Sequence, residues 1–594
     1  MRTETMAGRP RDRWTARAPL AALAAALLAT GAQAQDTRDP RVGLRAGWND
    51  AGEAVRGMEL VSHTSRPERF FNPGNMADFS LANTDMAFAG TRVFIGSYNG
   101  FQIYDISNPA SPRLAGSLVC PGGQGDVSVY RNLLFMSVEE TRGRLDCGTQ
   151  GVQDTVSTDR FRGVRIFDIS NLDRPRQVAS VQTCRGSHTH TLVPDARDPS
   201  RVYVYVQGTG GVRSASELQG CSARNSTEDP NTSYFRIEII EVPVARPQAA
   251  RIVNMPRIFA NAQTGAINGL NQGGRAGEGA QQTAQTNQCH DITAYPEIGL
   301  AAGACAGNGI LLDIRDPANP VRIDEVVDPN FAYWHSATFN NAGTKVLFTD
   351  EWGGGSAPRC RATDRPQWGA DAIFTLANRE LRHAGYFKLP AAQTEQENCV
   401  AHNGSLVPVP GRDIMVQAWY QGGISVFDFT DPAHPVEIAF FDRGPMSTTQ
   451  SVLGGFWSSY WYNGLIYASE IGRGLDVFRL TPSEHLSQNE IDAARLVRVS
   501  DFNPQNQRKV EWPASFVVAR AYVDQLTRSR GLSGTRSIAV ARALDQAERA
   551  TGARRRTALT QLATQLDADA QSSSDADRVR MLAAVVRDLA AGRR

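Results

Sequence analysis

The sequence predicts an all-β fold, a seven-bladed β-propeller followed by a C-terminal α-helical module. Three observations lead to this prediction: a strand pattern that recurs seven times, a composition rich in turn residues, and a change of hydrophobic period near the C-terminus. Of 594 residues, 53 are Gly and 30 are Pro, which favours a turn-rich β body. This length would suggest three or more domains unless one repeat occupies most of it.

The recurring pattern is a β-rich run, an Asp or its substitute, a turn that contains Pro, and a second β-rich run. The clearest copies are GFQIYDISNPASPRLAGSL from Gly100, GVRIFDISNLDRPRQVASV from Gly163, GILLDIRDPANPVRIDEVV from Gly309 and GISVFDFTDPAHPVEIAFF from Gly423. Weaker copies begin near Tyr234, Ala372 and Gly474. Alternating apolar residues indicate half-buried strands, and the Asp-Pro or Asn-Pro dipeptides end them. We expect the Asp residues of the clear copies to be structural: Asp105, Asp168, Asp313 and Asp428.

A further pair of strands precedes each copy, so that seven four-stranded units result. One such unit cannot cover its own faces, whereas seven units closed around a channel bury both faces of each sheet. The last unit lacks its fourth strand, and residues 57–62 have the pattern of the missing one. We expect this strand to pair with residues 474–479 and close the ring, so that the propeller spans residues 56–482.

Three segments lie outside the repeat. Residues 35–55 are expected to form a linker. Residues 254–288 are rich in Gly, Asn and Gln, which predicts a mobile insertion on one face of the propeller. Residues 483–594 form the helical module, in which the hydrophobic period changes to 3.6. Its four helices are predicted at residues 514–529, 535–550, 554–570 and 575–591.

The first 34 residues have the composition of a secretory signal peptide. An Arg-rich leader precedes a short apolar run over residues 19–28, and small residues stand at Ala32 and Ala34. No later stretch is apolar over the length of a membrane span, so we expect an exported protein without a transmembrane segment, periplasmic or secreted. The 62 basic and 61 acidic residues give a net charge of +1, which removes the simplest argument for a nucleic-acid partner.

Export implies an oxidising compartment, in which eight cysteines favour disulfides over free thiols. Their order along the chain suggests four local pairs: Cys120–Cys147, Cys184–Cys221, Cys289–Cys305 and Cys360–Cys399.

The xxIxDISNPxxP copies resemble the LVIVD repeat of exported bacterial β-propellers. The resemblance covers roughly residues 90–480 and implies the propeller fold. It implies no particular activity.

Four of the nine His residues occupy one position of the repeat. Alignment on His-x-x-Thr/Ser places them at the start of the innermost strand in consecutive blades three to six: His188, His290, His335 and His402. The other blades carry Thr84, Gly125 and Phe456 there. In a closed ring these four imidazoles should line one mouth of the channel and point at a common centre.

Neutral imidazole is the commonest metal ligand, and a nitrogen-rich set favours Cu or Fe, with Zn as a further option. His190 is a fifth candidate ligand, because it follows His188 by two residues along a strand. Asp291 is a candidate partner that would fix the tautomer of His290. The hydroxyl side chains three residues after each His are further candidate partners of the rings: Thr191, Thr293, Thr338 and Ser405.

Two other interpretations of the histidines stay open. The imidazoles could belong to a structural hydrogen-bond network within each blade, or they could form a metal-free site for a polar ligand. Among the other candidates, the strand end Asp350-Glu351-Trp352 could line the same face as the histidines, but a solvated acidic pair is the preferred interpretation. An aromatic wall near the channel could be formed by Trp419-Tyr420, Phe456-Trp457 and Tyr460-Trp461-Tyr462, but core packing is the preferred interpretation.

The leading hypothesis is an exported propeller whose multi-histidine transition-metal site makes it an oxidoreductase acting on a small molecule. At the level of fold, the predicted architecture is similar to that of carotenoid-cleaving oxygenases, in which four His from different blades hold iron. It is also similar to that of the copper-requiring selenium-binding and methanethiol-oxidase family. The competing hypothesis is a non-catalytic scaffold that binds a protein or polymer partner in the cell envelope. The sequence assigns no catalytic residue to either.

Overall fold

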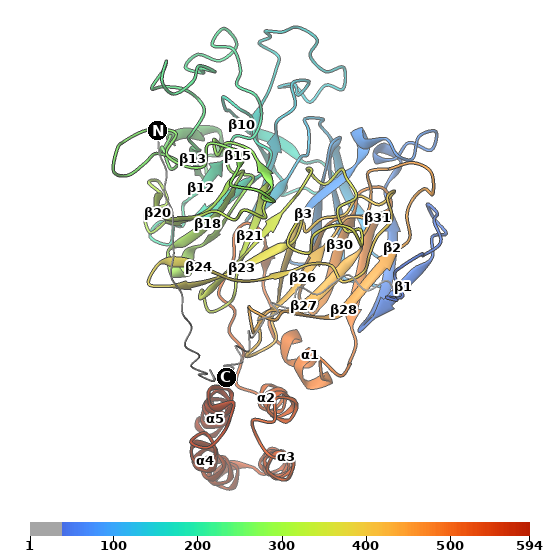
Figure 1. Cartoon of the computed structure of the whole chain (residues 1–594), viewed down its shortest axis with the longest axis vertical. Coiled ribbons are helices and arrows are strands. Elements are labelled where there is room, and N and C mark those ends of the chain that lie inside the picture. Colours follow the sequence, from blue (N-terminus) through green and yellow to red (C-terminus); the bar gives the residue numbers. More distant parts are fainter. Residues whose placement is uncertain (1–37, 594) are drawn as a thin grey trace, which may run out of the picture.

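The computed structural model describes residues 38–593, so the predicted signal peptide lies outside the described residues. Seven antiparallel sheets of four or five strands surround a central channel, and helices α2 to α5 lie together at one end of the ring (Figure 1). The predicted seven-bladed β-propeller is confirmed, and five α-helices follow it.

The blades are numbered in chain order, and the strands of each blade are given in order from the channel outward. Blade 1 holds β3 (Asn83–Ala89), β4 (Arg92–Ser97), β5 (Gly100–Asp105) and β6 (Arg113–Val119). Blade 2 holds β7 (Val127–Tyr130), β8 (Leu133–Val138), β9 (Gly163–Asp168) and β10 (Arg176–Gln182). Blade 3 holds β11 (His190–Pro194), β12 (Arg201–Val206), β13 (Glu238–Pro243) and β14 (Arg251–Asn254). Blade 4 holds β17 (Asp291–Tyr295), β18 (Leu300–Cys305), β19 (Asn308–Asp313) and β20 (Val321–Val326).

Blade 5 holds β21 (Trp334–Phe339), β22 (Lys345–Asp350), β23 (Asp371–Ala377) and β24 (Glu380–Phe387). Blade 6 holds β25 (Gly404–Val407), β26 (Ile414–Ala418), β27 (Ile424–Asp428) and β28 (Val436–Arg443). Blade 7 holds β29 (Phe456–Tyr462), β30 (Leu465–Glu470), β31 (Gly474–Leu480) and, as its outer strand, β2 (Met58–Ser65).

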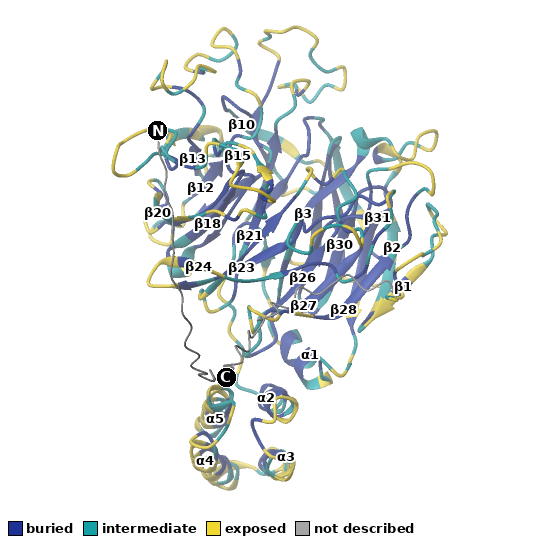
Figure 2. Cartoon of the chain, viewed as in Figure 1, coloured by how far each residue is buried: buried dark blue, intermediate teal, exposed yellow. Residues whose placement is uncertain are grey.

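The apolar core lies between neighbouring blades. Every residue of the inner strand β29 is buried, whereas no residue of the outer strand β6 is, and the exposed residues gather in loops and outer strands (Figure 2). At the junction of the first and last blades, Phe88 stacks on Tyr462 with ring centroids 4.6 Å apart. Burial on both faces explains why the inner strands are nearly continuous apolar runs.

The two ends of the repeat region close the ring as predicted. Strand β2 pairs with β31 in a register that runs from Met58 opposite Leu480 to Ser65 opposite Gly474. The preceding β1 (Glu53–Arg56) adds a fifth strand to blade 6 by pairing with β28, so part of the expected linker belongs to a sheet. The N-terminal segment therefore fastens blade 6 to blade 7.

The Asp residues of the four clear repeats make one and the same contact. Each accepts a hydrogen bond from the backbone N–H two residues further on, at 2.9 Å for Asp105, 2.9 Å for Asp168, 3.1 Å for Asp313 and 2.8 Å for Asp428. This geometry stabilises the turn after the third strand. These residues are structural.

The C-terminal part contains five helices, one more than predicted: α1 (Gln488–Arg495), α2 (Phe516–Arg528), α3 (Gly534–Arg549), α4 (Gly552–Asp569) and α5 (Ala576–Ala591). The additional helix α1 begins with a capping box between Ser487 and Glu490, and its buried Ile491 joins the core of blades 6 and 7. Its eight residues are too few for a clear hydrophobic period, although Ser-x-x-Glu is a start signal.

Residues 501–512 cross the end of the channel that lies away from the histidines. Strand β32 (Asp501–Phe502) pairs with β3, and the side chain of Asn503 exchanges hydrogen bonds with the backbone of Val129 in blade 2. Ala294 in blade 4 hydrogen-bonds the backbone of this segment on both sides of Asn506, and Trp512 donates to Pro408 O after β25. The segment thus ties several blades together and covers this mouth.

The segment 254–288, expected to be a mobile insertion, buries Ile258, Phe259 and Leu270 in the core and contains the short strands β15 (Gly274–Arg275) and β16 (Gln282–Thr283). The short 3-10 helices η1 to η4 span Glu68–Phe70, Phe79–Leu81, Pro247–Ala249 and Pro296–Ile298.

The structure contains four disulfides: Cys120–Cys147, Cys184–Cys221, Cys289–Cys305 and Cys360–Cys399.

Within residues 38–593, no helix has both the length and the apolar character that crossing a membrane requires.

Candidate metal centre

The four repeat histidines come together at the open mouth of the channel. Their rings form an arc in chain order, with centroids 4.5 Å apart for His188 and His290, 3.8 Å for His290 and His335, and 4.4 Å for His335 and His402. All four stand at or just before the start of an innermost strand. The ladder of blade 5 is irregular between Trp334 and Ala337, and such a bulge re-aims the side chains it contains, here that of His335.

Two of the rings are held from outside by strong acceptors. His188 Nδ1 lies 2.6 Å from Glu139 Oε1 in blade 2, and His402 Nδ1 donates to the backbone carbonyl of Trp457 in blade 7. Carboxylate and carbonyl oxygens only accept, so Nδ1 carries the proton in both rings. In the neutral form of each ring the lone pair is then on Nε2.

The two middle rings also have their partners at Nδ1. His290 Nδ1 lies 3.2 Å from Asp291 Oδ1, the contact expected for this neighbour, and His335 Nδ1 lies 3.4 Å from Thr349 Oγ1. Contacts of this kind at one ring nitrogen are typical of metal-binding histidines, because they orient the other nitrogen toward the ion.

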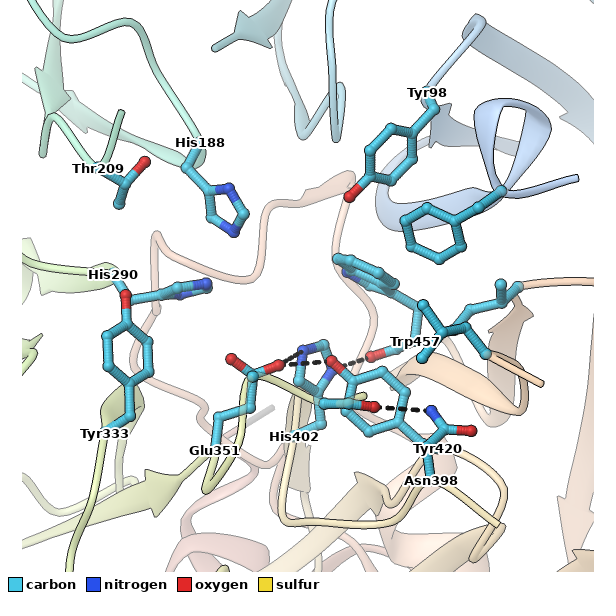
Figure 3. A pocket seen from close by; sticks show the side chains of 15 residues that line it. Tyr98, His188, Thr209, His290, Tyr333, Glu351, Asn398, His402, Tyr420 and Trp457 are labelled. Atoms are coloured by element: carbon cyan, nitrogen blue, oxygen red, sulfur yellow. Dashed lines mark hydrogen bonds and ion pairs between the residues drawn. The ribbon is translucent and has the colours of Figure 1, made fainter. Parts of the chain in front are cut away.

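Glu351 supplies a carboxylate to the same centre. Its Oε2 lies 3.8 Å from His335 Nε2 and its Oε1 lies 3.7 Å from His402 Nε2, both longer than a hydrogen bond. Tyr420 donates to Oε1 at 2.6 Å and so fixes the carboxylate (Figure 3). The Glu351 carboxylate therefore lies close to two imidazole nitrogens without forming a hydrogen bond to either.

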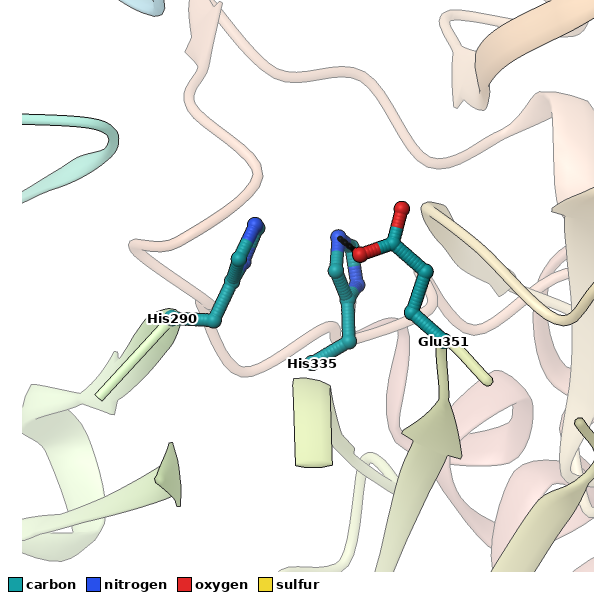
Figure 4. Close-up of side chains that lie close together, drawn as sticks. All are labelled: His290, His335 and Glu351. Atoms are coloured by element: carbon teal, nitrogen blue, oxygen red, sulfur yellow. Dashed lines mark ion pairs between the residues drawn. The ribbon is translucent and has the colours of Figure 1, made fainter. Parts of the chain in front are cut away.

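His290, His335 and Glu351 form the tightest group (Figure 4). One ligand atom from each lies within 4.8 Å of the others. Ligands bound at about 2.0–2.2 Å to a common ion are at most about 4.4 Å apart, so small side-chain movements suffice to bind a metal. His188 and His402 flank this group in the arc of rings.

Burial favours the neutral form of two of these imidazoles, His335 and His402. Burial, and then the neighbouring rings, hold the pKa of His335 well below its usual value, and burial lowers the pKa of His402 to about 3. Burial alone would also lower the pKa of His188, but the Glu139 carboxylate outweighs it and raises this pKa. Burial raises the pKa of Glu351. Neutral imidazole is the form that binds metals.

A cavity of about 330 Å³ opens beside the group of His290, His335 and Glu351. Its lining residues come from most of the blades: Phe79, Tyr98, His188, Thr209, His290, Tyr333, Glu351, Gly354, Gly355, Asn398, His402, Tyr420, Leu453, Trp457 and Ile471. The cavity offers a small molecule direct access to the histidines (Figure 3).

His190, predicted as a fifth ligand, does not belong to this group. Its Nδ1 lies 2.8 Å from Ser137 Oγ and 3.3 Å from Asp126 Oδ2, and it does not line the cavity. Strand β11 begins only at His190, so the strand period of two does not relate it to His188.

The four hydroxyl side chains that were expected beside the rings also lie elsewhere. Thr191 donates to the backbone of Ile292 at 2.5 Å, and Ser405 accepts from Trp461 N at 2.9 Å. Thr293 lies within the ladder opposite Ala302, and Thr338 lines a separate cavity beside residues 497–510. Three residues along a strand span about 10 Å, which carries these side chains away from the imidazoles.

Glu351 and Tyr420 were not predicted as site residues, because a solvated strand end and core packing were the preferred interpretations. Both are buried, with Glu351 only 6% exposed and Tyr420 only 3%. The available signal was antiparallel pairing: Trp334 pairs with Asp350, so the end of β22 lies beside the start of β21. Asp350 itself is structural, because its carboxylate accepts from the backbone N–H groups of Ala332, Tyr333 and Gly369.

Comparisons with known proteins give the family of one blade. Residues 84–119, which span β3 to β6, match the LVIVD repeat. No curated protein matches the chain.

Among solved structures, the periplasmic gluconolactonase of Pseudomonas aeruginosa is 12% identical with a TM-score of 0.38, over 67% of this chain and 96% of that one. The N-terminal domain of Nup159 is 8% identical with a TM-score of 0.38, over 71% of this chain and 95% of that one. A Lactobacillus plantarum protein is 10% identical with a TM-score of 0.37, over 61% and 82%. Likenesses at this level carry no argument about activity. The chain is a seven-bladed β-propeller whose first blade matches the LVIVD repeat.

Proposed function

We propose that this protein binds one transition-metal ion at the histidine cluster and acts as a metal-dependent oxidoreductase on a small molecule. The observation that carries the proposal is the orientation of the rings. Each of the four has its outer partner at Nδ1. The four partners are different chemical groups: the carboxylates of Glu139 and Asp291, the hydroxyl of Thr349 and the backbone carbonyl of Trp457. A purely structural histidine needs no such convergence on a shared centre.

The donor set favours iron. His290, His335 and Glu351 provide two imidazoles and one carboxylate, the combination that non-haem Fe(II) oxygenases use with open coordination positions. His188 and His402 could complete a nitrogen-rich set that suits Cu(II), and Zn(II) would accept the same ligands. Iron is therefore the first metal to test, with copper and zinc as the alternatives.

The cavity supports catalysis rather than a purely structural metal. Structural metal sites are closed by protein ligands, whereas catalytic sites keep a position for water or substrate. His188, His290, Glu351 and His402 all line the cavity, so a bound ion would face it. Tyr420 and Glu139 would hold two of the ligands in place from behind.

We propose further that the protein is exported to the periplasm or secreted. The four disulfides support this, because they persist in oxidising compartments. The test is the N-terminal sequence of protein recovered from the native host. Cleavage after Ala34 is expected, and intact protein that is retained in the cytoplasm with reduced cysteines would overturn this proposal.

The metal proposal is tested by elemental analysis of protein purified without chelators and of metal-free protein titrated with Fe(II), Cu(II) or Zn(II). We expect one ion per chain, lost in the His290→Ala/His335→Ala variant and kept in the control His434→Ala, whose side chain is exposed in a repeat turn. Oxidation is then measured as O2 uptake by the metal-loaded protein over a panel of small molecules. No metal bound by the unmodified protein would overturn the proposal in favour of a scaffold.

A further inference from the structure

The cavity beside the metal-binding group has two unlike halves. One half is the imidazoles and Glu351. The other half is aromatic and aliphatic and comes from blades 1 and 7 and the loops beside them: Phe79, Tyr98, Leu453, Trp457 and Ile471. Tyr98 and Trp457 lie across the cavity from His188 and His290 (Figure 3).

The lining carries little charge that could hold an ionic molecule. No Lys or Arg is among its residues, and its one carboxylate, Glu351, already accepts from Tyr420. A carboxylate, sulfate or phosphate group would find no counterion here except a bound metal, and burying an unpaired charge is costly. The cavity therefore favours an uncharged molecule.

The aromatic half presents flat faces and few free polar atoms. Phe79 and Tyr98 contact each other with ring centroids 4.7 Å apart, and Trp457 packs edge-on against His402. The side chain of Asn398 already has hydrogen-bond partners within the protein, because its Nδ2 donates to Gly355 O and its Oδ1 accepts from Gln421. A sugar with many hydroxyl groups would leave most of them without partners on this wall.

One buried donor is nevertheless left over. The indole N–H of Trp457 has no acceptor among the residues that the structure describes, although Trp457 is only 7% exposed. Buried indole N–H groups normally have a partner, so an acceptor on a ligand would satisfy it. Trp457 lies at an irregularity of the β29–β30 ladder between Phe456 and Ser458, and such bulges re-aim a side chain.

We propose that the molecule bound in this cavity is an uncharged phenol. Its ring would pack against Tyr98 and Trp457, a ring substituent oxygen would accept from the Trp457 indole, and its phenolic oxygen would face the histidine cluster. Aromatic rings pack well against such a wall, and a cavity of about 330 Å³ holds one substituted benzene ring. This inference rests on the proposed function for the role of the phenolic oxygen, but the packing against the aromatic wall does not need the metal.

The test is isothermal titration calorimetry with 2-methoxyphenol, on chelator-treated protein and on metal-loaded protein. We expect binding in both forms, about tenfold or more tighter with the metal. We expect 1,2-dimethoxybenzene, which lacks the phenolic O–H, to lose the gain from the metal. Cyclohexanol should bind at least tenfold more weakly than the phenol in both forms. In the chelator-treated form, where no metal can act as a counterion, 3-methoxybenzoate should also bind at least tenfold more weakly.

Two variants locate the binding site. Trp457→Phe keeps an aromatic face but removes the donor, and should weaken 2-methoxyphenol binding about five- to tenfold, as expected for one hydrogen bond. The matched control is Trp461→Phe, four residues along the same strand, whose indole N–H is also buried without a partner but lines a different cavity. If circular dichroism shows that Trp457→Phe is misfolded, Tyr98→Leu, at a partly exposed position, serves as a second variant of the binding site.

The two proposals fail in different ways. Phenol binding by a protein that takes up no metal would refute the metal centre and leave the phenol site standing. Metal uptake without phenol binding, equal affinity for cyclohexanol, or unchanged affinity in both Trp457→Phe and Tyr98→Leu would overturn the phenol inference and leave the metal centre standing.

Discussion

Two positions of the same repeat, the turn Asp and the inner-strand His, behave in opposite ways. In four blades the turn Asp makes an identical local bond to the backbone two residues further on. In four blades the histidines have four different outer partners, Glu139, Asp291, Thr349 and the carbonyl of Trp457, and yet they face one centre. The structural Asp thus repeats its contact from blade to blade, whereas the histidines repeat only the direction of their rings.

The blades without histidine support this distinction. Thr84 donates to the backbone of Gln124 at 2.7 Å, and Gly125 has φ +68 and lies against Ser97. In blade 7 the bulge at Phe456 and Ser458 presents Trp457 instead. Three different solutions satisfy the same position, so the propeller does not require an imidazole there.

The largest effect is expected from removing a central ligand. His335→Ala should weaken metal binding more than 1000-fold, about 4 kcal/mol, because it removes one member of the tightest group and leaves a cavity. The measurement is competition against a chelator of known affinity. Retained affinity would show that His335 does not bind the ion, and Glu140→Gln, at the same mouth of the channel, is the control.

The second-largest effect is expected from metal removal, which should lower the stability of the whole propeller. An ion present at 100 times its Kd stabilises the folded state by about 2.7 kcal/mol, provided that the unfolded chain does not bind it. Scanning calorimetry with and without a chelator measures the shift in Tm. The shift should vanish in His335→Ala, and an equal shift in that variant would place the stabilising ion elsewhere.

At a position without histidine, substitution should affect the fold and leave the metal. Gly125→Ala puts a Cβ 2.5 Å from Ser97 O at a positive φ, so we expect a loss of about 2 kcal/mol in the free energy of unfolding. Urea denaturation measures this loss, and elemental analysis should still find one ion per chain. Loss of the metal in this variant would contradict a purely structural role for this position.

The smallest effect is expected at the turn Asp. Asp168→Ala should cost about 1 kcal/mol by removing the bond to Ser170, and Asp168→Asn should cost less because its side-chain oxygen still accepts. Hydrogen bonds from Ser170 lower the pKa of Asp168 to about 2, below its unfolded value, so the stabilisation is present at neutral pH and is lost as the pH falls from about 4 to 2. Urea denaturation at pH 7 and pH 3 measures both effects, and an equal loss for the two variants would contradict this account of the turn.

The sequence was sufficient for the architecture because the repeat is periodic. Seven copies of a turn pattern fixed the blades, and the unpaired last unit predicted the strand β2 beside β31. The gathering of the four histidines followed from their common repeat position. Helix α1 was missed because its signals are local and short, as were β1 and the cover formed by residues 501–512.

The remaining parts of the site come from strand geometry that no repeat alignment contains. Glu351 reaches the centre from a second strand, and Tyr420 from the end of another blade's second strand. His190 and the predicted Ser/Thr partners lie away from the cluster. The innermost strands begin irregularly, so counting residues along an ideal strand does not give the direction of a side chain.

X-ray absorption fine structure of the metal-loaded protein measures the ligands of the ion. We expect a single type of site with at least two imidazoles and one carboxylate oxygen at about 2.0–2.2 Å, and the carboxylate contribution should be lost in Glu351→Gln. An ion without imidazole scattering, or a spectrum unchanged by Glu351→Gln and His290→Ala, would contradict this expectation.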